Sequence, residues 1–294
     1  MTVSIATDAF GRFDRLSFVS RRQARAGLGG EHRSRRRSPS TDFVDYRPYQ
    51  PGDDFRRVDW NVFGRLGTLQ VKVTEARERL DIVLVLDCSS SMGYGQPDKL
   101  GFATQLVAAL GYVAMARSDS VRIVCLTEHP AQGGFLKSFG RRSSMPDLVR
   151  QLSQVAPAGL LDINAGLSAC VPDAARQPLV VVVSDLLTRD GLSLGLAALQ
   201  ARQADVVVLH VVSPDEVDPR LAGEVELIDA ETNQVLEVGM SLETLSAYRA
   251  RFASWLNERE AESHARGVRY ARLMTDRPLA SVVLDDLRSA GVLR

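Results

Sequence analysis

Short apolar runs alternate with longer amphipathic stretches from residue 79 to the end of the chain. A short run rich in β-branched residues is typical of a strand buried on both faces, and apolar positions three or four residues apart are typical of a helix packed on a sheet. The predicted strands are 82–86, 121–127, 134–139, 179–184, 205–212 and 268–274. The predicted helices are 99–116, 144–155, 163–174, 192–203, 242–262 and 278–290. This alternation predicts an α/β fold with a doubly wound, mostly parallel sheet.

The residues before this main domain do not follow the alternation. Residues 1–40 hold nine arginines and three acidic residues, which predicts a flexible basic arm. Residues 41–78 have too few regularly spaced apolar positions for a core of their own, so we expect them to pack on the main domain, with residues 71–73 added to a sheet edge. Within the main domain, 79–294, a polar stretch between two short apolar segments predicts a β-hairpin inserted near 224–238.

The first strand of the main domain is followed directly by Asp87-Cys-Ser89-Ser-Ser91. In open α/β sheets the ligand site lies beyond the carboxyl ends of the strands. One carboxylate and two hydroxyls at this position are oxygen donors of the kind that Mg²⁺ or Mn²⁺ prefers. A serine-rich polar turn without a metal is the alternative, because carboxylates there also stabilise the N-termini of neighbouring helices.

This motif after an apolar strand resembles the metal-ion-dependent adhesion site of von Willebrand factor A (vWA) domains. The metal ligands that the resemblance implies are Asp87, Ser89, Ser91, Asp162 and Asp185. Leu161 stands where vWA domains have a threonine, so the site lacks one hydroxyl, and Asp162 or Asn164 is expected to supply an oxygen instead. The implied cofactor is Mg²⁺ or Mn²⁺.

A second motif lies ahead of the main domain. Its charged and aromatic residues are Arg47, Tyr49, Asp53, Asp54, Arg56, Asp59 and Trp60, around a turn at Pro51-Gly52. Together with the vWA-type motif, it resembles the DUF58 family, whose members are commonly encoded beside MoxR-type AAA+ ATPases. We expect the motif either to hold its segment on the main domain through ion pairs and the apolar anchor of Trp60, or to dock a partner.

Composition narrows the possible functions. The net charge is zero, so the chain has no overall bias toward nucleic acid or anionic membranes. The arginine run 33–37 could contact phosphates, but it has no interleaved aromatic residues for base stacking, and a solvated arm is the alternative. Three cysteines in apolar stretches predict buried thiols rather than disulfides. Because no signal peptide or membrane span is recognisable, we expect a cytoplasmic protein.

The resemblance implies a non-enzymatic interaction module whose strand-end face binds an acidic side chain of a partner. The implied partner is a MoxR-type AAA+ ATPase, with a role in the assembly or maturation of other proteins. The alternative is a Mg-dependent phosphatase-like hydrolase that uses Asp87 as the nucleophile. Such enzymes need a second aspartate where this chain has Ser89, and a later lysine, whereas no lysine follows Lys137. The sequence therefore predicts a binding protein rather than an enzyme.

Overall fold

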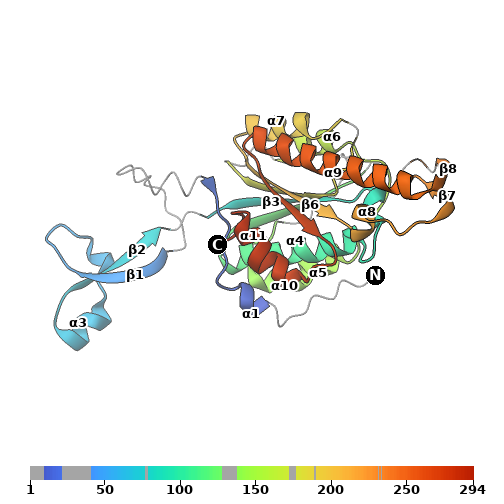
Figure 1. The fold of residues 1–294 in the computed structure, drawn as a ribbon. Helices are drawn as coiled ribbons and strands as arrows, with labels where there is room; N and C mark the ends of the chain where they lie inside the picture. Colours follow the sequence, from blue (N-terminus) through green and yellow to red (C-terminus); the bar gives the residue numbers. More distant parts are fainter. Residues whose placement is uncertain are drawn as a thin grey trace. The chain divides into compact units, whose positions relative to one another are not determined.

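The computed structural model describes residues 10–21, 41–76, 79–127, 138–171, 177–188, 190–230, 232 and 234–294. The chain divides into two compact units, a smaller one of residues 29–79 and a larger one of residues 1–28 and 80–294. Figure 1 shows the main sheet with its helices in the larger unit, and a hairpin with one helix in the smaller unit.

The main sheet has five parallel strands among the described residues, in the order β4-β3-β5-β6-β9. They are β3 (Asp81–Asp87), β4 (Ser120–Leu126), β5 (Leu179–Ser184), β6 (Asp205–Val212) and β9 (Arg269–Met274). Successive side chains on a strand point to opposite faces, and both faces of this sheet are covered. The central strands are therefore buried along almost their whole length. The predicted doubly wound α/β fold is confirmed.

Helices cover both faces of this sheet (Figure 1). On one face lie α4 (Lys99–Ala116), α5 (Met145–Leu152), α10 (Leu279–Ser281) and α11 (Leu287–Ser289). On the other lie α6 (Ile163–Ala169), α7 (Ser193–Ala201) and α9 (Leu242–Ala265). Among the described helices, α4 is the one that is long and apolar enough to cross a membrane, and 78% of it is buried inside the structure.

Several predicted elements differ in detail from the structure. The predicted edge strand 134–139 is described at its end, where Phe139 forms an antiparallel bridge with Val121, while residues 131–137 lie outside the described residues. The predicted helix 278–290 is interrupted by a π-helical segment, Val282–Asp286, between α10 and α11. Its wider turn keeps Val282 and Val283 buried in the core. The three predicted buried thiols are free and buried.

The predicted flexible arm differs from the structure over residues 10–21, which belong to the core of the larger unit. The short helix α1 (Phe10–Phe13) begins this segment, and Phe13, Leu16 and Phe18 are buried in the same hydrophobic cluster as Val292 and Leu293. Backbone hydrogen bonds join Ser17 and Arg294 in both directions, at 3.1 and 3.0 Å. Apolar residues between the arginines explain the difference, because they can be buried while the arginines stay in water. Residues 1–9 and 22–40 lie outside the described residues.

Three short elements stand at the carboxyl ends of the parallel strands. A 3₁₀ turn, η3 (Ser90–Gly93), follows β3, and α8 (Pro214–Val217) follows β6. The strands β7 (Gly223–Ile228) and β8 (Val235–Met240) then pair antiparallel, over the residues where the sequence predicts a hairpin. The helix α9 starts directly after this hairpin and runs back across the sheet (Figure 1).

The smaller unit is built on its own two-stranded antiparallel sheet, of β1 (Thr41–Pro48) and β2 (Gln70–Ala76). The connection between them holds a 3₁₀ turn, η2 (Phe55–Arg57), and the helix α3 (Trp60–Leu66). Residues 71–73, predicted to add to a sheet edge, form part of a strand that pairs with β1 in this separate sheet and not with the main sheet. The predicted packing of 41–78 on the main domain stays a prediction.

Candidate functional site

The carboxylate of Asp87 lies at the carboxyl end of β3, buried between two hydrogen-bond donors. The Ser89 amide donates to its Oδ1 at 2.9 Å, and the Ser184 hydroxyl, at the end of the neighbouring strand β5, donates to its Oδ2 at 2.5 Å. Burial raises the pKa of Asp87 to about 6, and the nearby charge of Asp185 acts in the same direction. Asp87 is therefore a structural acceptor that joins the ends of two parallel strands.

The two serines of the same motif lie next to each other. The hydroxyl oxygens of Ser89 and Ser91 are 3.0 Å apart, with Ser89 buried and Ser91 partly exposed. Ser89 stands at the N-cap of η3 without a side-chain cap bond, so its hydroxyl is directed to Ser91 rather than to the backbone. This pair is the part of the predicted metal site with the fewest competing contacts.

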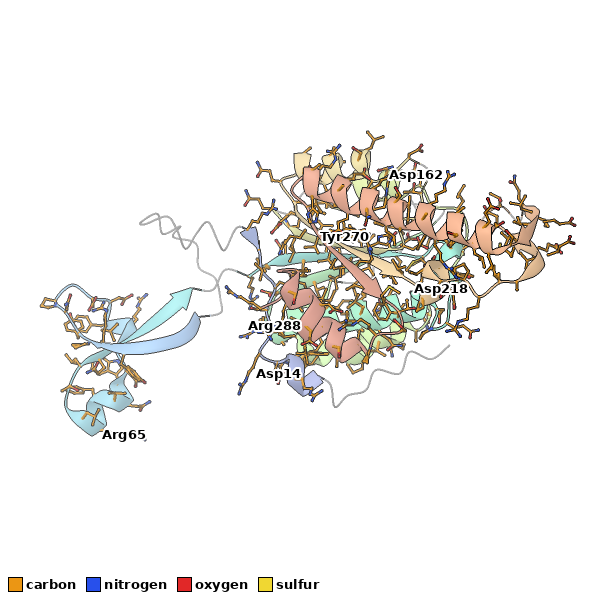
Figure 2. The ribbon with its side chains drawn as sticks, viewed as in Figure 1. Asp14, Arg65, Asp162, Asp218, Tyr270 and Arg288 are labelled. Carbon is orange, nitrogen blue, oxygen red and sulfur yellow. The ribbon has the colours of Figure 1, made fainter. Side chains whose placement is uncertain are left out.

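In the second predicted loop, the side chains of Asp162 and Asn164 already form hydrogen bonds with backbone groups. Asp162 caps α6 and accepts the Ala165 amide at 3.0 Å; its side chain is exposed (Figure 2). Asn164 donates to the Gly191 carbonyl at 3.0 Å and accepts the Gly195 amide at 2.7 Å, so its amide joins α6 to α7 and to the turn before α7. Asn164 therefore has a structural role here and does not replace the missing threonine.

A lysine, which sequence reasoning did not assign to the site, lies against the third predicted loop. The Lys99 ammonium, fully buried at the start of α4, donates to Asp185 Oδ2 at 2.7 Å and to Glu216 Oε1 at 2.5 Å. Burial alone would lower the pKa of Lys99, but the two carboxylates outweigh it, and the pKa is raised. Lys99 is thus a buried, permanently charged group between two acids.

Both acids are oriented by the backbone as well as by the lysine. Asp185 accepts the Leu187 amide through Oδ1 at 3.1 Å. Glu216 accepts the Ser213 amide through Oε2 at 2.8 Å and completes a capping box at the start of α8. The signal for Glu216 was present in the sequence as Ser213-Pro-Asp-Glu216, a capping-box spacing.

This donor set does not fit a divalent cation as arranged. One oxygen of Asp185 faces an ammonium, both oxygens of Asp87 accept hydrogen bonds, and Leu161 offers no donor atom. Over the described residues, no group of three or more histidine, cysteine, aspartate or glutamate side chains is suited to hold a metal. We therefore derive no chemistry from a metal at this site.

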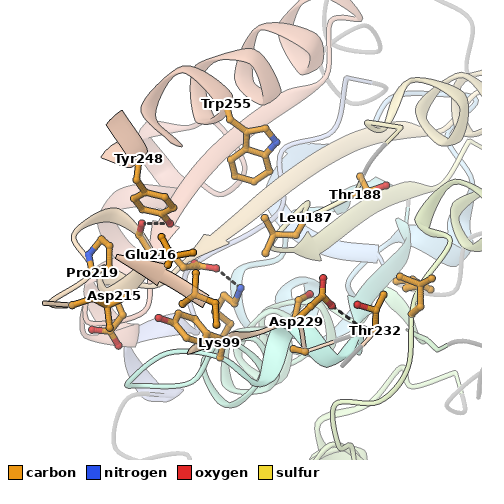
Figure 3. A pocket seen from close by; sticks show the side chains of 18 of the residues that line it. Lys99, Leu187, Thr188, Asp215, Glu216, Pro219, Asp229, Thr232, Tyr248 and Trp255 are labelled. Atoms are coloured by element: carbon orange, nitrogen blue, oxygen red, sulfur yellow. Dashed lines mark hydrogen bonds and ion pairs between the residues drawn. The ribbon is translucent and has the colours of Figure 1, made fainter. Parts of the chain in front are cut away.

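A pocket of about 1150 Å³ opens above these residues. Ser91, Lys99 and Glu216 are among the residues that line it, and Figure 3 shows Tyr248 and Trp255 reaching into it from α9. Apolar side chains of the hairpin, among them Leu227, form another wall. The charged residues among those described around it are the lysine and five carboxylates, Asp162, Asp190, Asp215, Glu216 and Asp229. The pocket is therefore largely apolar in its walls and acidic in its charge.

The motif of the smaller unit builds the local structure of that unit. The Arg47 guanidinium forms two hydrogen bonds with the Asp53 carboxylate, at 2.7 and 2.5 Å, and Asp53 also accepts the Gln50 amide across the turn. Tyr49 stacks on Phe55 with ring centroids 5.2 Å apart.

The rest of the motif caps two short helices. Asp54 accepts the Arg56 amide at the start of η2. Asp59 caps α3 and accepts the Tyr46 hydroxyl at 2.8 Å. Trp60, expected to be an apolar anchor, is 58% exposed and meets Phe63 edge-on.

The fold and the site define a doubly wound α/β protein with an apolar, acidic pocket at the carboxyl ends of its parallel strands. The model of the family described as "Protein of unknown function DUF58" matches residues 45–262, and the chain belongs to this family. Curated relatives include the uncharacterized proteins Rv1480 of Mycobacterium tuberculosis and Mb1516 of Mycobacterium bovis. Each is 29% identical over 220 residues, which cover 71% of this chain and 67% of the relative.

The chain is also similar, at low sequence identity, to several solved structures. The conserved hypothetical protein BatB from Bacteroides thetaiotaomicron is 15% identical, with a TM-score of 0.42, and the match covers 72% of this chain and 98% of BatB. Proximal thread matrix protein 1 of the mussel byssus, with a zinc-occupied MIDAS motif, is 16% identical over 47% of this chain and 39% of its own, with a TM-score of 0.35. Because these scores are low, the fold assignment rests on the strand order of the sheet itself.

Proposed function

We propose that this chain is a non-enzymatic protein-binding module whose strand-end pocket receives a segment of a partner protein. The observation that carries the proposal is the pocket of about 1150 Å³ with apolar walls. It lies where ligands bind in open α/β sheets, and its volume is somewhat above the roughly 300–1,000 Å³ of small-molecule pockets, which leaves room for a segment of a protein. Leu227 and Tyr248, which line it, are both more than one-third exposed, as expected of a surface that a partner would cover.

The contacts of Asp87 argue against the hydrolase alternative. A nucleophilic carboxylate needs an oxygen that can reach the substrate, whereas Asp87 is buried with both oxygens hydrogen-bonded. The lysine that such enzymes need does lie near the site, as Lys99, but its ammonium is held by Asp185 and Glu216. These contacts favour binding over catalysis.

The charges of the pocket favour a partner segment with apolar side chains and at least one arginine or lysine. Five carboxylates against one lysine repel an acidic side chain and attract a basic one. The sequence predicts the opposite partner, an acidic side chain, because a bound metal would coordinate it. We propose the basic partner because the cation here is Lys99, and its charge is already balanced by Asp185 and Glu216. An acidic side chain of a partner would therefore find no free positive charge in the pocket.

The partner we propose to test first is the MoxR-type AAA+ ATPase that the family resemblance implies, and the same resemblance implies a role in protein assembly or maturation. Leu227 lines the pocket, whereas the next residue, Ile228, points to the opposite face of the hairpin because side chains alternate along a strand. The two positions therefore make a matched pair of variants on one exposed strand.

Leu227→Arg should weaken binding of the ATPase, because it places bulk and positive charge in the pocket that receives the partner. Ile228→Arg, with the same change of charge on the other face, should leave binding within about threefold of the parent. Biolayer interferometry at two salt concentrations measures the affinity of the ATPase for the parent and for each variant. Equal affinities of the two variants would reject the pocket as the binding site, and no binding to the parent would reject the ATPase as the partner.

A further inference from the structure

We propose that Lys99 is the resident cation of the strand-end site, in the role that a divalent metal has in an adhesion-type site. The consequence is that this face keeps its structure and its charge balance without a metal. The inference goes beyond the proposed function, since it concerns the charge balance of the site and is tested without any partner.

The first argument is the position of the ammonium. Asp185 follows β5 directly and is the acid that the vWA resemblance assigns to the metal, and Lys99 Nζ lies 2.7 Å from its Oδ2. The Lys99 side chain is fully buried beneath the pocket, so its charge is compensated mainly by the two carboxylates. A buried ammonium needs partners for its charge and its three protons, and two of these are given to Asp185 and Glu216.

The second argument is that Lys99 is held in this place from both ends. Its backbone amide donates to the Tyr94 carbonyl at 3.1 Å, and the preceding Asp98 caps α4 through the Gly101 amide. At the other end, the backbone amides of Leu187 and Ser213 orient the two acids. The ammonium therefore lies between two carboxylates, Asp185 and Glu216, which the backbone orients as it would orient the ligands of a metal.

The third argument is electrostatic exclusion. A divalent ion bound to Asp185 would lie within a few ångströms of the buried ammonium, where two like charges repel and are screened less than in bulk water. Such an ion would have to displace the lysine from two short ion pairs. The missing threonine hydroxyl, at Leu161, removes one ligand that could have compensated.

The experiment is isothermal titration of Mn²⁺ and Mg²⁺ into the full chain, with melting temperatures in EDTA and in excess Mn²⁺. The parent should give no binding heat and the same melting temperature in both. Lys99→Ala removes the ammonium and leaves the acids, so it should gain one Mn²⁺ site and melt at a higher temperature with Mn²⁺ than with EDTA. Lys99→Ala/Leu161→Thr should bind Mn²⁺ tighter still, by roughly tenfold, because the hydroxyl is restored.

The matched control is Arg150→Ala, which removes an exposed cation and should gain no metal site. Binding of Mn²⁺ to the parent that is lost in Asp185→Asn would overturn the inference. So would a Lys99→Ala protein that is folded by near-ultraviolet circular dichroism and still binds no metal. Should Lys99→Ala not fold in EDTA, rescue of folding by Mn²⁺ is the supporting result, and failure of every divalent ion to rescue it is the contradicting one.

Discussion

At the scale of single residues, the site depends on charged groups that are buried together. Asp87, Asp185 and Glu216 are carboxylates with little contact with water, and Lys99 is the ammonium among them. The pKa of Glu216 is raised by its burial, although Lys99 opposes the shift. Burial therefore disfavours the charged form of Glu216, and the ion pair with Lys99 compensates for part of that cost.

The burial of Asp87 predicts a pH dependence of folding. Its pKa is about 6 in the folded chain against an ordinary value of 3.8, so the folded state binds more protons between these values, and stability should fall as the pH rises from about 4 to 6. Asp87→Asn removes the titrating group. The loss of unfolding free energy between about pH 4 and pH 6 should therefore be smaller in the variant, by on the order of 3 kcal/mol. Urea unfolding at steps of pH measures it; parallel curves for parent and variant would contradict the assignment.

The sequence predicted the residues at the strand ends and missed the lysine, for a physical reason. Asp87 and Asp185 follow apolar strands, and parallel strands bring their carboxyl ends to one edge of a sheet. Lys99 begins a helix, where a lysine is ordinarily exposed, and its long side chain reaches the site only once α4 is packed on the sheet. Contacts made by long side chains depend on packing, which spacing along the chain does not specify.

At the scale of elements, the sequence predicted the helices and strands whose apolar residues recur regularly. It did not predict which strand pairs with which in the smaller unit. The bounds of α4, β5 and β6 agree with the predictions, because their apolar residues are nearly continuous. β1 mixes polar and apolar residues and gave no strand signal, so the partner of residues 71–73 could not be recognised. Pairing of a strand is decided by the whole unit rather than by the strand itself.

The link between α6 and α7 gives a prediction at this scale. Asn164→Ala leaves the Gly191 carbonyl and the Gly195 amide without their partner and should destabilise the chain by about 1–3 kcal/mol. Ser153→Ala, which removes one exposed hydrogen bond, should change stability by about 0.5 kcal/mol or less. Chemical unfolding compares the two. A loss at Asn164 no greater than the loss at Ser153 would show that the amide does not hold the helices together.

At the scale of the whole molecule, the larger unit is closed by residues from both ends of the chain. Phe18 and Leu293 form an antiparallel bridge, and Val19 donates to the Val292 carbonyl at 2.9 Å. The Arg269 guanidinium donates to the Val19 and Gly291 carbonyls and to the Asp205 carboxylate, so it joins the two terminal segments to the sheet. A segment that composition marks as a basic arm is, over residues 10–21, part of the core.

This closure predicts that the N-terminal segment stabilises the larger unit although it is far from the pocket. Phe18 is almost fully buried, so Phe18→Ala should leave a cavity and destabilise the chain by about 3–5 kcal/mol. Arg12→Ala, on an exposed position of the same segment, should change stability by about 0.5 kcal/mol or less. Thermal and urea unfolding of the two variants measure the difference. Because the cavity is at the closure and not at the strand ends, folded Phe18→Ala should bind a pocket partner with the affinity of the parent. If the two variants were equally stable, residues 10–21 would not be part of the core, and the flexible arm expected from composition would be the better description.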